Sequence, residues 1–385
     1  MKKILFICPR NPFSERYSGD VIRAKKFIYS LSKNHYVKVI STNFKDIKKK
    51  ESKLSYEGFK EISFFIKFFY IFFSLIKLKP IQLGYFFSPK IKEYVQNNFQ
   101  NYDLIFFQSF RTAQYMPKDI QKSCILDMGD LMSINYKQTS VRYFFFNPIR
   151  IIYYIESFLV KKYEYFCFQK FTKILLLSKK ELDSVEKKFR GKVAQISFGI
   201  TNINKIYRFH QKNYKIIFIG NIKYAPNKKA CYEFANKILP LVNKIYPNIE
   251  FHIIGEISKI DKFLLKKKTN VKVLGRIKNL DPHLDKTICG IANLKIATGI
   301  QTKLLTYMSY GIPSVCSQEV IKNFDAIKES KMSFYRNNEE MIKIIFKYKK
   351  NKNFSLNASK RALKTIKKFK WEKVLSILDK VLNKY

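Results

Sequence analysis

The sequence is short of acidic residues. Its 385 residues include 74 Lys and Arg but only 29 Asp and Glu, which gives a formal net charge of +45. Such an excess favours anionic partners, namely nucleic acids, anionic lipids or phosphorylated ligands. The chain is also rich in Lys, Ile, Asn, Phe and Tyr throughout, so part of the charge can equally be a compositional background. Because Lys greatly outnumbers Arg, on which readers of DNA bases rely, no nucleic-acid partner is expected.

Several short motifs that identify other classes of protein are also missing. There is no GxGxxG fingerprint and no GxxxxGK[ST] loop, which argues against a nicotinamide enzyme and a P-loop NTPase. None of the six cysteines forms a CxxC pair, so we predict reduced core cysteines and no metal site. The apolar run at Ile4–Cys8 is too short for the hydrophobic region of a signal peptide, and a first buried strand is the better interpretation.

What is present is a repeated pattern of short apolar runs and helical segments. The start of the chain predicts a strand at 4–8, a helix from Asp20 to about Asn34 that Asp20 can cap, and a strand at 36–41. Strand, helix and strand in that order form a parallel, right-handed unit. Further strands of this half are expected at 103–107, 124–126, 173–177 and 193–196.

The same pattern restarts after a polar stretch without clear periodicity. Strands are expected at 215–219, 250–254, 271–274, 291–294 and 314–316, with helices at 229–245 and 303–310. The sequence therefore predicts an α/β protein of two doubly wound, Rossmann-like domains with parallel sheets. We place them at residues 1–200 and 214–370, joined by a linker at 201–213. Ligands of such folds bind beyond the carboxyl ends of the strands, and two facing domains would form a cleft there.

Six segments, in order, resemble one known family. They are the loop and helix start from Asn11-Pro12 to Arg23, the strand and turn at 103–115, the block of Asp127, Asp130, Glu156 and Glu164, the turn at 218–227, the segment 299–308, and the helix that begins at Trp371. Together they resemble the group 1 retaining glycosyltransferases of GT-B fold, and most closely the sugar transferases of exosortase and exopolysaccharide loci. The resemblance implies an acceptor-side first domain, completed by a helix at 371–385, and a nucleotide-sugar-binding second domain.

The activity implied by the resemblance is of the hexosyltransferase type. A sugar would pass from a nucleotide-diphosphate sugar to a cell-surface polysaccharide or lipid-linked glycan, with retention of configuration. The donor is a substrate, so no cofactor is expected, and the absence of a DxD motif predicts transfer without a metal ion. Two glutamates of the family's donor loop are replaced here by Thr298 and Thr306, and a family histidine is absent near Gln108 and Ser109. A non-catalytic GT-B scaffold that binds a glycan or a partner protein is the alternative.

Candidate donor-binding residues gather in the second half. Glycosyl transfer requires that the leaving diphosphate is neutralised and the acceptor aligned. Backbone N–H groups at a helix start can face phosphate, and a lysine there can pair with it as a catalytic cation. A solvated lysine and a surface arginine are the structural alternatives. The resemblance also implies a ribose contact at Thr306. The donor-side candidates are Asn221, Arg276, Gly299, Ile300, Gln301, Thr302, Lys303 and Thr306.

Candidate residues of the first half lie at strand ends and at one helix start. Gly19 would let the backbone approach a ligand closely, and Asp20 and Arg23 are further substrate-binding candidates, with a capped turn as the alternative. Asp127 and Asp130 follow a strand and can contact acceptor hydroxyl groups; capping of a turn is the alternative for both.

Two further side chains of the first half attract attention. Arg111 belongs to the matched strand and turn and is a candidate catalytic residue, together with Lys303 and the two aspartates. Glu156 lies on the apolar face of a helix that Asn147-Pro148 opens. A carboxylate in such surroundings needs a partner, which predicts a structural salt bridge.

The segment 62–76 is intensely apolar. It is shorter than the roughly 20 residues that span a bilayer, and Lys67 interrupts it. It is either a buried helix of the first domain or a helix that lies in the membrane interface. With the aromatic residues at 143–146 and the net charge, we favour a cytoplasmic protein bound peripherally to the anionic inner face of the cell membrane.

Overall fold

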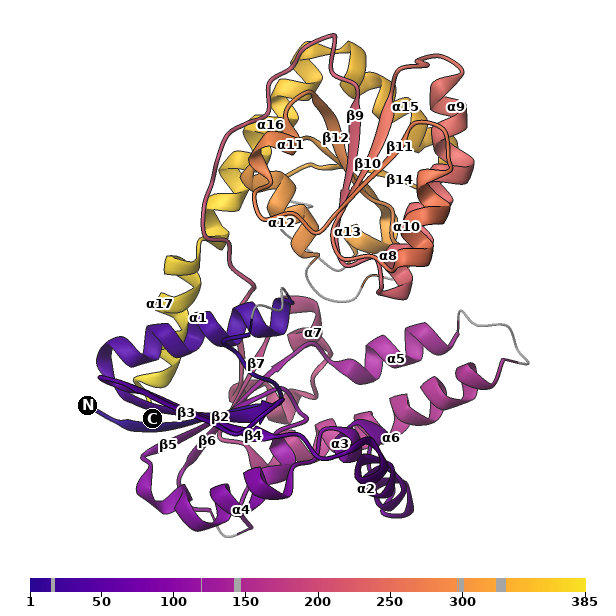
Figure 1. Cartoon of the computed structure of the whole chain (residues 1–385). Coiled ribbons are helices and arrows are strands. Elements are labelled where there is room, and N and C mark those ends of the chain that lie inside the picture. The colour runs from indigo at the N-terminus through magenta and orange to yellow at the C-terminus, as the bar shows by residue number, and fades with distance from the viewer. Residues whose placement is uncertain (15–17, 119, 142–146, 296, 298–300, 323–329) are drawn as a thin grey trace. The chain divides into compact units, whose positions relative to one another are not determined.

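The computed structural model describes all residues except 15–17, 119, 142–146, 296, 298–300 and 323–329, and it divides the chain into two compact units (Figure 1). Unit 1 comprises Met1–Phe198 and Glu372–Tyr385, and unit 2 comprises Gly199–Trp371. Each unit is a layered α/β structure built on its own sheet. The residues 201–213, expected to be a linker, belong to unit 2.

Unit 1 is built on a sheet of eight strands in the order β3-β4-β2-β1-β5-β6-β7-β8. All neighbours pair in parallel except β3 and β4, which are antiparallel. Strands such as KILFIC and LIFFQ are almost wholly apolar because helices cover both faces of a parallel sheet. The strands are β1 (Lys3–Cys8), β2 (Tyr36–Asn43), β3 (Ile47–Glu51), β4 (Leu54–Lys60), β5 (Leu104–Gln108), β6 (Ser123–Gly129), β7 (Lys173–Leu176) and β8 (Val193–Gln195).

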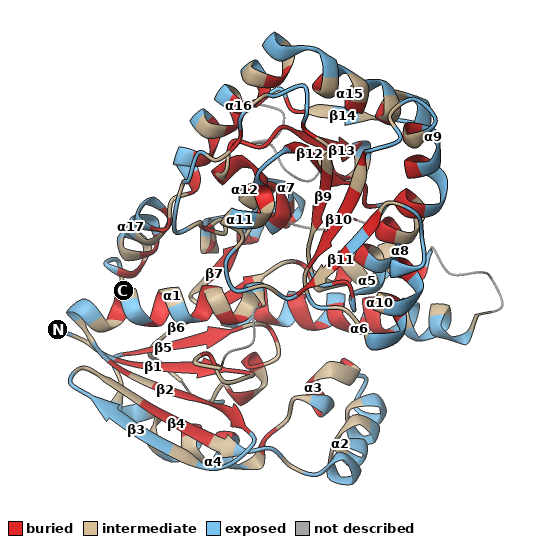
Figure 2. Ribbon diagram, turned by 45° about the horizontal axis from the view of Figure 1, so that its top comes forward, coloured by how far each residue is buried: buried red, intermediate tan, exposed pale blue. Residues whose placement is uncertain are grey.

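The helices of unit 1 connect these strands, and the last one comes from the end of the chain. Figure 2 shows the buried strands in red between helices that turn their pale-blue faces outward. The helices are α1 (Gly19–Asn34), α2 (Phe64–Ile76), α3 (Ile81–Tyr85), α4 (Pro89–Asn98), α5 (Met132–Ser140), α6 (Pro148–Lys170), α7 (Lys179–Ser184) and α17 (Trp371–Leu382).

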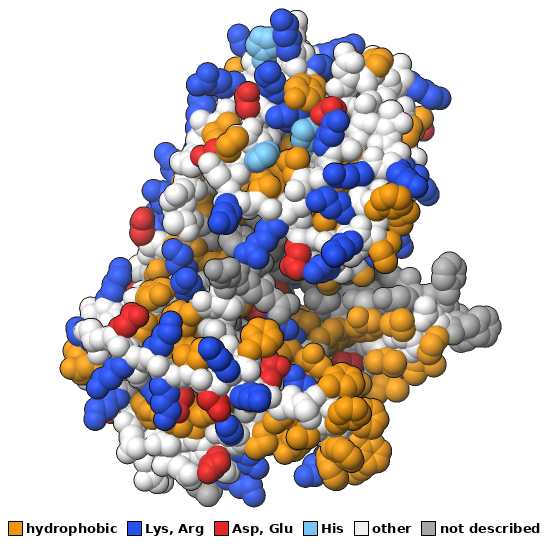
Figure 3. Space-filling model, in the orientation of Figure 1, with side chains coloured by type: hydrophobic (Ala, Val, Ile, Leu, Met, Phe, Trp, Pro, Cys, Tyr) orange, Lys and Arg blue, Asp and Glu red, His pale blue; other side chains and the backbone are white. Residues whose placement is uncertain are grey.

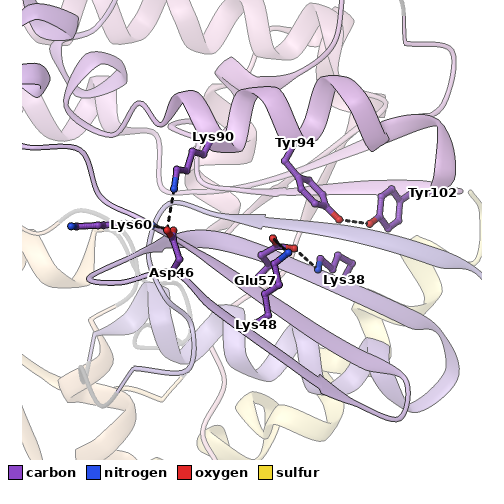
Figure 4. Close-up of polar contacts among 8 residues, drawn as sticks. All are labelled: Lys38, Asp46, Lys48, Glu57, Lys60, Lys90, Tyr94 and Tyr102. Atoms are coloured by element: carbon purple, nitrogen blue, oxygen red, sulfur yellow. Dashed lines mark hydrogen bonds and ion pairs between the residues drawn. The ribbon is translucent and has the colours of Figure 1, made fainter.

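One edge of this sheet carries a charged hairpin, which the sequence pattern did not predict. Strand β3 has the sequence IKKKE, with no apolar alternation, and its lysines disfavour pairing with another chain. The Glu57 carboxylate of β4 forms ion pairs with Lys38 Nζ at 2.7 Å and with Lys48 Nζ at 3.1 Å (Figure 4). Burial opposes ionisation of Glu57, but the two lysines outweigh it and hold its pKa below the usual range.

Unit 2 is built on six parallel strands in the order β11-β10-β9-β12-β13-β14. The strands are β9 (Lys215–Ile219), β10 (Glu250–Ile254), β11 (Val271–Gly275), β12 (Thr287–Ala292), β13 (Ser314–Ser317) and β14 (Ser333–Tyr335). The helices are α8 (Ala225–Glu233), α9 (Leu239–Asn243), α10 (Lys259–Lys266), α11 (Asp281–Leu284), α12 (Thr302–Ser309), α13 (Gln318–Ile321), α15 (Asn338–Lys350) and α16 (Lys352–Ile366). The predicted pair of doubly wound parallel-sheet units is therefore confirmed.

The strand predicted at 291–294 lies earlier, at β12. Gly290 falls inside this strand, where a glycine is normally unfavourable. The ring of Tyr307 explains it, because a Cβ on Gly290 would lie 2.6 Å from that ring. The Tyr307 hydroxyl in turn accepts from the backbone N–H of Ile219 at 2.9 Å, which ties α12 to the sheet.

All six cysteines are free and buried, as the sequence predicted. They lie in the apolar interiors of the two units, and burial raises the pKa of each thiol. Among the described residues, no group of three or more His, Cys, Asp or Glu side chains is placed to hold a metal ion.

The apolar segment at 62–76 forms α2, and no residue of this helix is buried. Of the two alternatives for this segment, the buried helix is therefore wrong, and the aromatic residues at 143–146 lie outside the described residues. Within the described part of the chain, no helix is long and apolar enough to cross a membrane.

Candidate functional site

Glycines follow three neighbouring strands at the carboxyl edge of the unit 2 sheet. Gly220, Gly255 and Gly275 come at the ends of β9, β10 and β11. Gly255 has a φ of +139°, and a Cβ there would lie 1.8 Å from the carbonyl oxygen of Gly220. The loops after β9 and β10 are thus in direct backbone contact, which only glycine permits. This edge is where a doubly wound fold binds its ligand.

Lys303 lies beside this edge as the second residue of α12. Its side chain is 6% exposed. Its Nζ donates to Asn227 Oδ1 at 3.1 Å and to Gln301 Oε1 at 3.3 Å, and it lies 5.1 Å from the ring centroid of Phe218. Within the described residues no carboxylate pairs with it.

This environment disfavours the ammonium form of Lys303. Burial lowers the pKa of the side chain to about 8. A cation in the first turn of a helix also opposes the helix dipole. A buried charge that only neutral amide oxygens contact is costly unless a counter-ion arrives. This environment would favour an anionic ligand, and the role of Lys303 in binding one stays a prediction.

Asn227 organises the same corner, and the sequence analysis did not single it out. It lies in α8, where its Oδ1 accepts from Lys303 and its Nδ2 donates to the carbonyl of Asn221 at 2.8 Å. The candidate Asn221 is exposed, and its Oδ1 accepts from the N–H of Lys223 at 3.0 Å. The available signal was the position of Asn227 in the turn 218–227, which the resemblance had already marked.

The remaining donor-side candidates surround the start of α12. Gln301 is the N-cap residue, and Thr302 is exposed at the first helical position. The Thr306 hydroxyl donates a hydrogen bond to the carbonyl of Thr302 at 3.1 Å, so its O–H group is already used within the helix. Arg276 is exposed directly after Gly275. Thr298 and the candidates Gly299 and Ile300 lie outside the described residues.

In unit 1, the candidates Arg23 and Asp127 form a buried ion pair. Arg23 Nε donates to Asp127 Oδ2 at 2.8 Å and Nη2 donates to Oδ1 at 2.9 Å. Arg23 Nη1 also donates to the carbonyl of Ser197 at 3.0 Å. The side chains are 4% and 2% exposed. The two residues thus satisfy each other inside the unit, instead of presenting open polar groups to a substrate as expected.

Asp130 lies three positions past Asp127, directly after β6, and one of its carboxylate oxygens is unpartnered among the described residues. Its Oδ1 is buried and has no hydrogen-bond partner among the described residues. Burial, with the nearby charges of Glu181 and Asp127, raises the pKa of Asp130 to about 7, while Arg23 opposes the rise. Of the two candidate aspartates, Asp130 is therefore the one that keeps an unpartnered carboxylate oxygen among the described residues, and its contact with an acceptor stays a prediction.

The start of α1 differs from the prediction. Ser18 is the N-cap residue, and the helix begins at Gly19, so Asp20 is not the cap. Its carboxylate instead accepts from Arg10 Nη1 at 3.2 Å. A Cβ on Gly19 would make an ordinary contact of 3.6 Å with Phe198, so packing does not require glycine at this position.

Arg111 and Glu156 both attach to the first turn of α3. Arg111 Nε donates to Gln82 Oε1 at 2.6 Å, and its guanidinium lies 4.7 Å from the ring centroid of Phe86. The Glu156 carboxylate accepts from the N–H groups of Ile81 at 2.8 Å and Gln82 at 3.2 Å. Burial raises the pKa of Glu156, and these two bonds counter it. Glu156 is therefore paired with a helix N-terminus, and not with the cationic side chain that a predicted salt bridge requires.

Comparisons with known proteins agree with this architecture. Residues 213–345 match the family model described as glycosyl transferases group 1. A sucrose-phosphate synthase from Thermosynechococcus elongatus superimposes with a TM-score of 0.73 at 10% identity, covering 100% of this chain and 99% of that one. An alpha,alpha-trehalose 6-phosphate synthase from Burkholderia multivorans gives 0.69 at 8% identity, with 100% and 99% covered. Anabaena HepE, solved in complex with UDP and glucose, gives 0.65 at 11% identity, with both chains covered completely.

The fold is GT-B. These identities are too low to carry more than the fold, and a search of the curated protein sequences found no match. The family match, at residues 213–345, lies within unit 2. It includes the carboxyl ends of β9 to β11 and the start of α12. The match to an exosortase-associated subgroup, implied by the resemblance, stays a prediction.

Proposed function

We propose that this protein is a glycosyltransferase that moves a hexosyl group from a nucleotide-diphosphate sugar to a cell-surface polysaccharide or lipid-linked glycan. The observation that carries the proposal is Lys303, a buried lysine without a carboxylate partner among the described residues, at a helix start inside the segment that matches glycosyl transferases group 1. The GT-B fold supports it, because both units present the carboxyl edge of a parallel sheet.

On the donor side, the bond from the sugar's anomeric carbon to the diphosphate oxygen breaks, and negative charge grows on the leaving diphosphate. Lys303 and the N–H groups at the start of α12 stabilise that charge. Asn227 fixes the Lys303 ammonium, while the glycines after β9 and β10 let the backbone approach the ligand. Arg276 and Asn221 are exposed at the same edge and can contact the donor's base or phosphates.

On the acceptor side, a hydroxyl oxygen forms the new bond to the anomeric carbon, and its proton passes to a carboxylate. Asp130 of unit 1 has a buried Oδ1 without a hydrogen-bond partner among the described residues, and we assign it to that hydroxyl. Its raised pKa makes it a proton acceptor whose conjugate acid persists to near neutral pH. We further propose a metal-independent reaction with retention, since Lys303 supplies the cation that a metal would otherwise bring.

We place the protein at the cytoplasmic face of an anionic membrane. The support is the exposed α2 with its phenylalanines, together with the net charge of +45. A lipid-linked acceptor would be concentrated at that surface.

A panel of nucleotide sugars, assayed with EDTA present, tests the activity. Release of a nucleoside diphosphate from one member of the panel, and faster release with a glycan acceptor, is the expected result. The configuration of the product, followed by NMR, tests retention. If a glycan binds but no donor is ever cleaved, the protein is a GT-B scaffold without catalysis.

A further inference from the structure

The exposure of α2 is unusual because no residue of the helix is buried and only one narrow face, at Lys67, Tyr70, Ile71 and Ser74, is half-buried. A helix on a soluble protein normally buries one apolar face. Here the exposed side chains include Phe65 at 81%, Phe69 at 61% and Ile76 at 61%. Further exposed apolar residues of the helix are Phe64, Ile66, Phe68, Phe72, Phe73 and Leu75. The side chains of α2 therefore contribute little to the core of unit 1.

The backbone of α2 is nevertheless firmly held. Gly84 of α3 packs so closely that a Cβ there would lie 2.4 Å from the carbonyl oxygen of Tyr70. The Tyr70 ring contacts Phe87 with 4.5 Å between centroids. Lys67 pairs with Glu61 at 2.6 Å. The helix is thus attached to unit 1 through its backbone and its few polar or half-buried side chains. Its other apolar side chains remain exposed.

Helix α6 adds a second exposed apolar surface, and it is attached to α3 as α2 is. Its Glu156 holds the first turn of α3, so α2 and α6 both attach to the same short helix. Figure 3 shows hydrophobic side chains gathered over α2 and along α6. The exposed apolar residues of the first half of α6 are Ile149, Ile151, Ile152, Tyr154, Ile155 and Phe158. We call these residues and those of α2 the apolar platform.

We propose that the apolar platform is a two-helix membrane anchor, in which α6 enters one leaflet of an anionic bilayer together with α2. This rests on the proposed function and deepens its membrane location. The charges next to the platform fit that occupant, since Lys60, Lys77 and Lys79 are exposed at the ends of α2 and Lys161 and Lys162 follow the exposed part of α6. Lysines there meet anionic headgroups while the apolar side chains enter the acyl region.

Flotation with liposomes of phosphatidylcholine and phosphatidylglycerol tests the two-helix anchor. Three triple variants of the full chain are compared: Phe65→Ser/Phe69→Ser/Phe72→Ser on α2, Ile151→Ser/Ile155→Ser/Phe158→Ser on α6, and Ile260→Ser/Phe263→Ser/Leu264→Ser on α10. The α10 set is the matched control, because its side chains are 73%, 59% and 43% exposed but lie in unit 2. We expect the α2 and α6 variants each to lower membrane partitioning at least about tenfold, and the control to leave it unchanged.

Flotation of the α6 variant at the wild-type level would overturn the proposal and leave α2 as a lone anchor. An equal loss in the α10 control would overturn it as well, because the binding would not be local. If the wild type fails to float but forms an oligomer that the α2 or α6 changes dissociate, the platform is a protein interface instead. Melting curves confirm that each variant folds. Nucleotide-induced stabilisation of the α6 variant reports on the proposed glycosyltransferase site separately, so either proposal can fail alone.

Discussion

At the scale of single residues, the donor-side candidates depend on a lysine whose charge is poorly supported until a ligand binds. Lys303 contacts two amide oxygens and a phenyl ring, and burial lowers its pKa to about 8. Bound diphosphate would supply the missing counter-charge and raise that pKa. Binding of the ligand and protonation of Lys303 are therefore linked.

The linkage predicts how affinity depends on pH. Below about pH 8 the free protein already carries the proton, and the affinity for a nucleoside diphosphate should be flat once the ligand is fully ionised. Above about pH 8 the free lysine loses its proton, so binding must take one up and the affinity should fall by up to about tenfold per pH unit. Titration calorimetry from pH 7 to 10 checks this, and Lys303→Met should remove the slope. A slope that persists in the variant would assign the linkage to another group.

Thr306 offers a second test at the residue scale. The resemblance places a carboxylate at this position, where it would accept bonds from both ribose hydroxyl groups. The Thr306 hydroxyl donates to its own helix, and Thr306→Glu should tighten nucleotide binding, because charge-assisted bonds are about twice as strong as neutral ones. The new carboxylate would lie one turn from Lys303, where opposite charges are compatible. Calorimetry that gives equal or weaker affinity in the folded variant would show that α12 does not hold the ribose.

At the scale of elements, apolar runs were predicted well and polar contacts between distant segments were not. The bounds of β9 (KIIFI) and β10 (EFHII) follow directly from the sequence because their runs are mostly apolar and end abruptly at a glycine. Strand β3 was missed because an edge strand of lysines has no apolar alternation. The pairing of Arg23 with Asp127 joins residues 104 positions apart, and no local pattern encodes it.

The pairing of α5 with α6 provides a prediction at this scale. Glu164 of α6 accepts from the N–H of Ser133 at 3.1 Å at the start of α5, and burial raises the pKa of this carboxyl to about 7. The folded pKa lies above the unfolded one, so unit 1 loses stability as pH rises from about 4.5 to about 7 and changes little above that. Glu164→Gln removes this titration. Between about pH 4.5 and pH 7 its free energy of unfolding should therefore rise, relative to that of the wild type, by on the order of 2–3 kcal/mol.

Thermal or urea unfolding at pH 5 and pH 8 checks the prediction for Glu164. The comparison is made between the two proteins at each pH, so that other titrating groups such as Asp130 contribute equally to both. A difference in stability that is the same at both pH values would mean that Glu164 ionises normally in the folded protein.

At the scale of the whole molecule, two doubly wound units follow from the alternation of apolar strands and helices, and the GT-B resemblance follows from motifs in a fixed order. The roles of single side chains were less accessible. Local rules predicted a helix cap for Asp20 and a salt bridge for Glu156. In the structure, Asp20 accepts from Arg10, and Glu156 accepts from the N-terminus of α3. Such partners depend on which strand ends and helix ends meet in space, and a single sequence does not contain that information.

The most direct test of the central claim is cleavage of a nucleotide-diphosphate sugar, with EDTA present, by three proteins: the wild type, Lys303→Met and Lys266→Met. Lys266 is an exposed lysine of α10 and serves as the matched control. The account predicts that the wild type and Lys266→Met release the nucleoside diphosphate at similar rates. Lys303→Met should keep or raise the melting temperature, because it removes a poorly supported buried charge, while its turnover falls about 10²–10³-fold. Unchanged turnover in folded Lys303→Met would contradict the account.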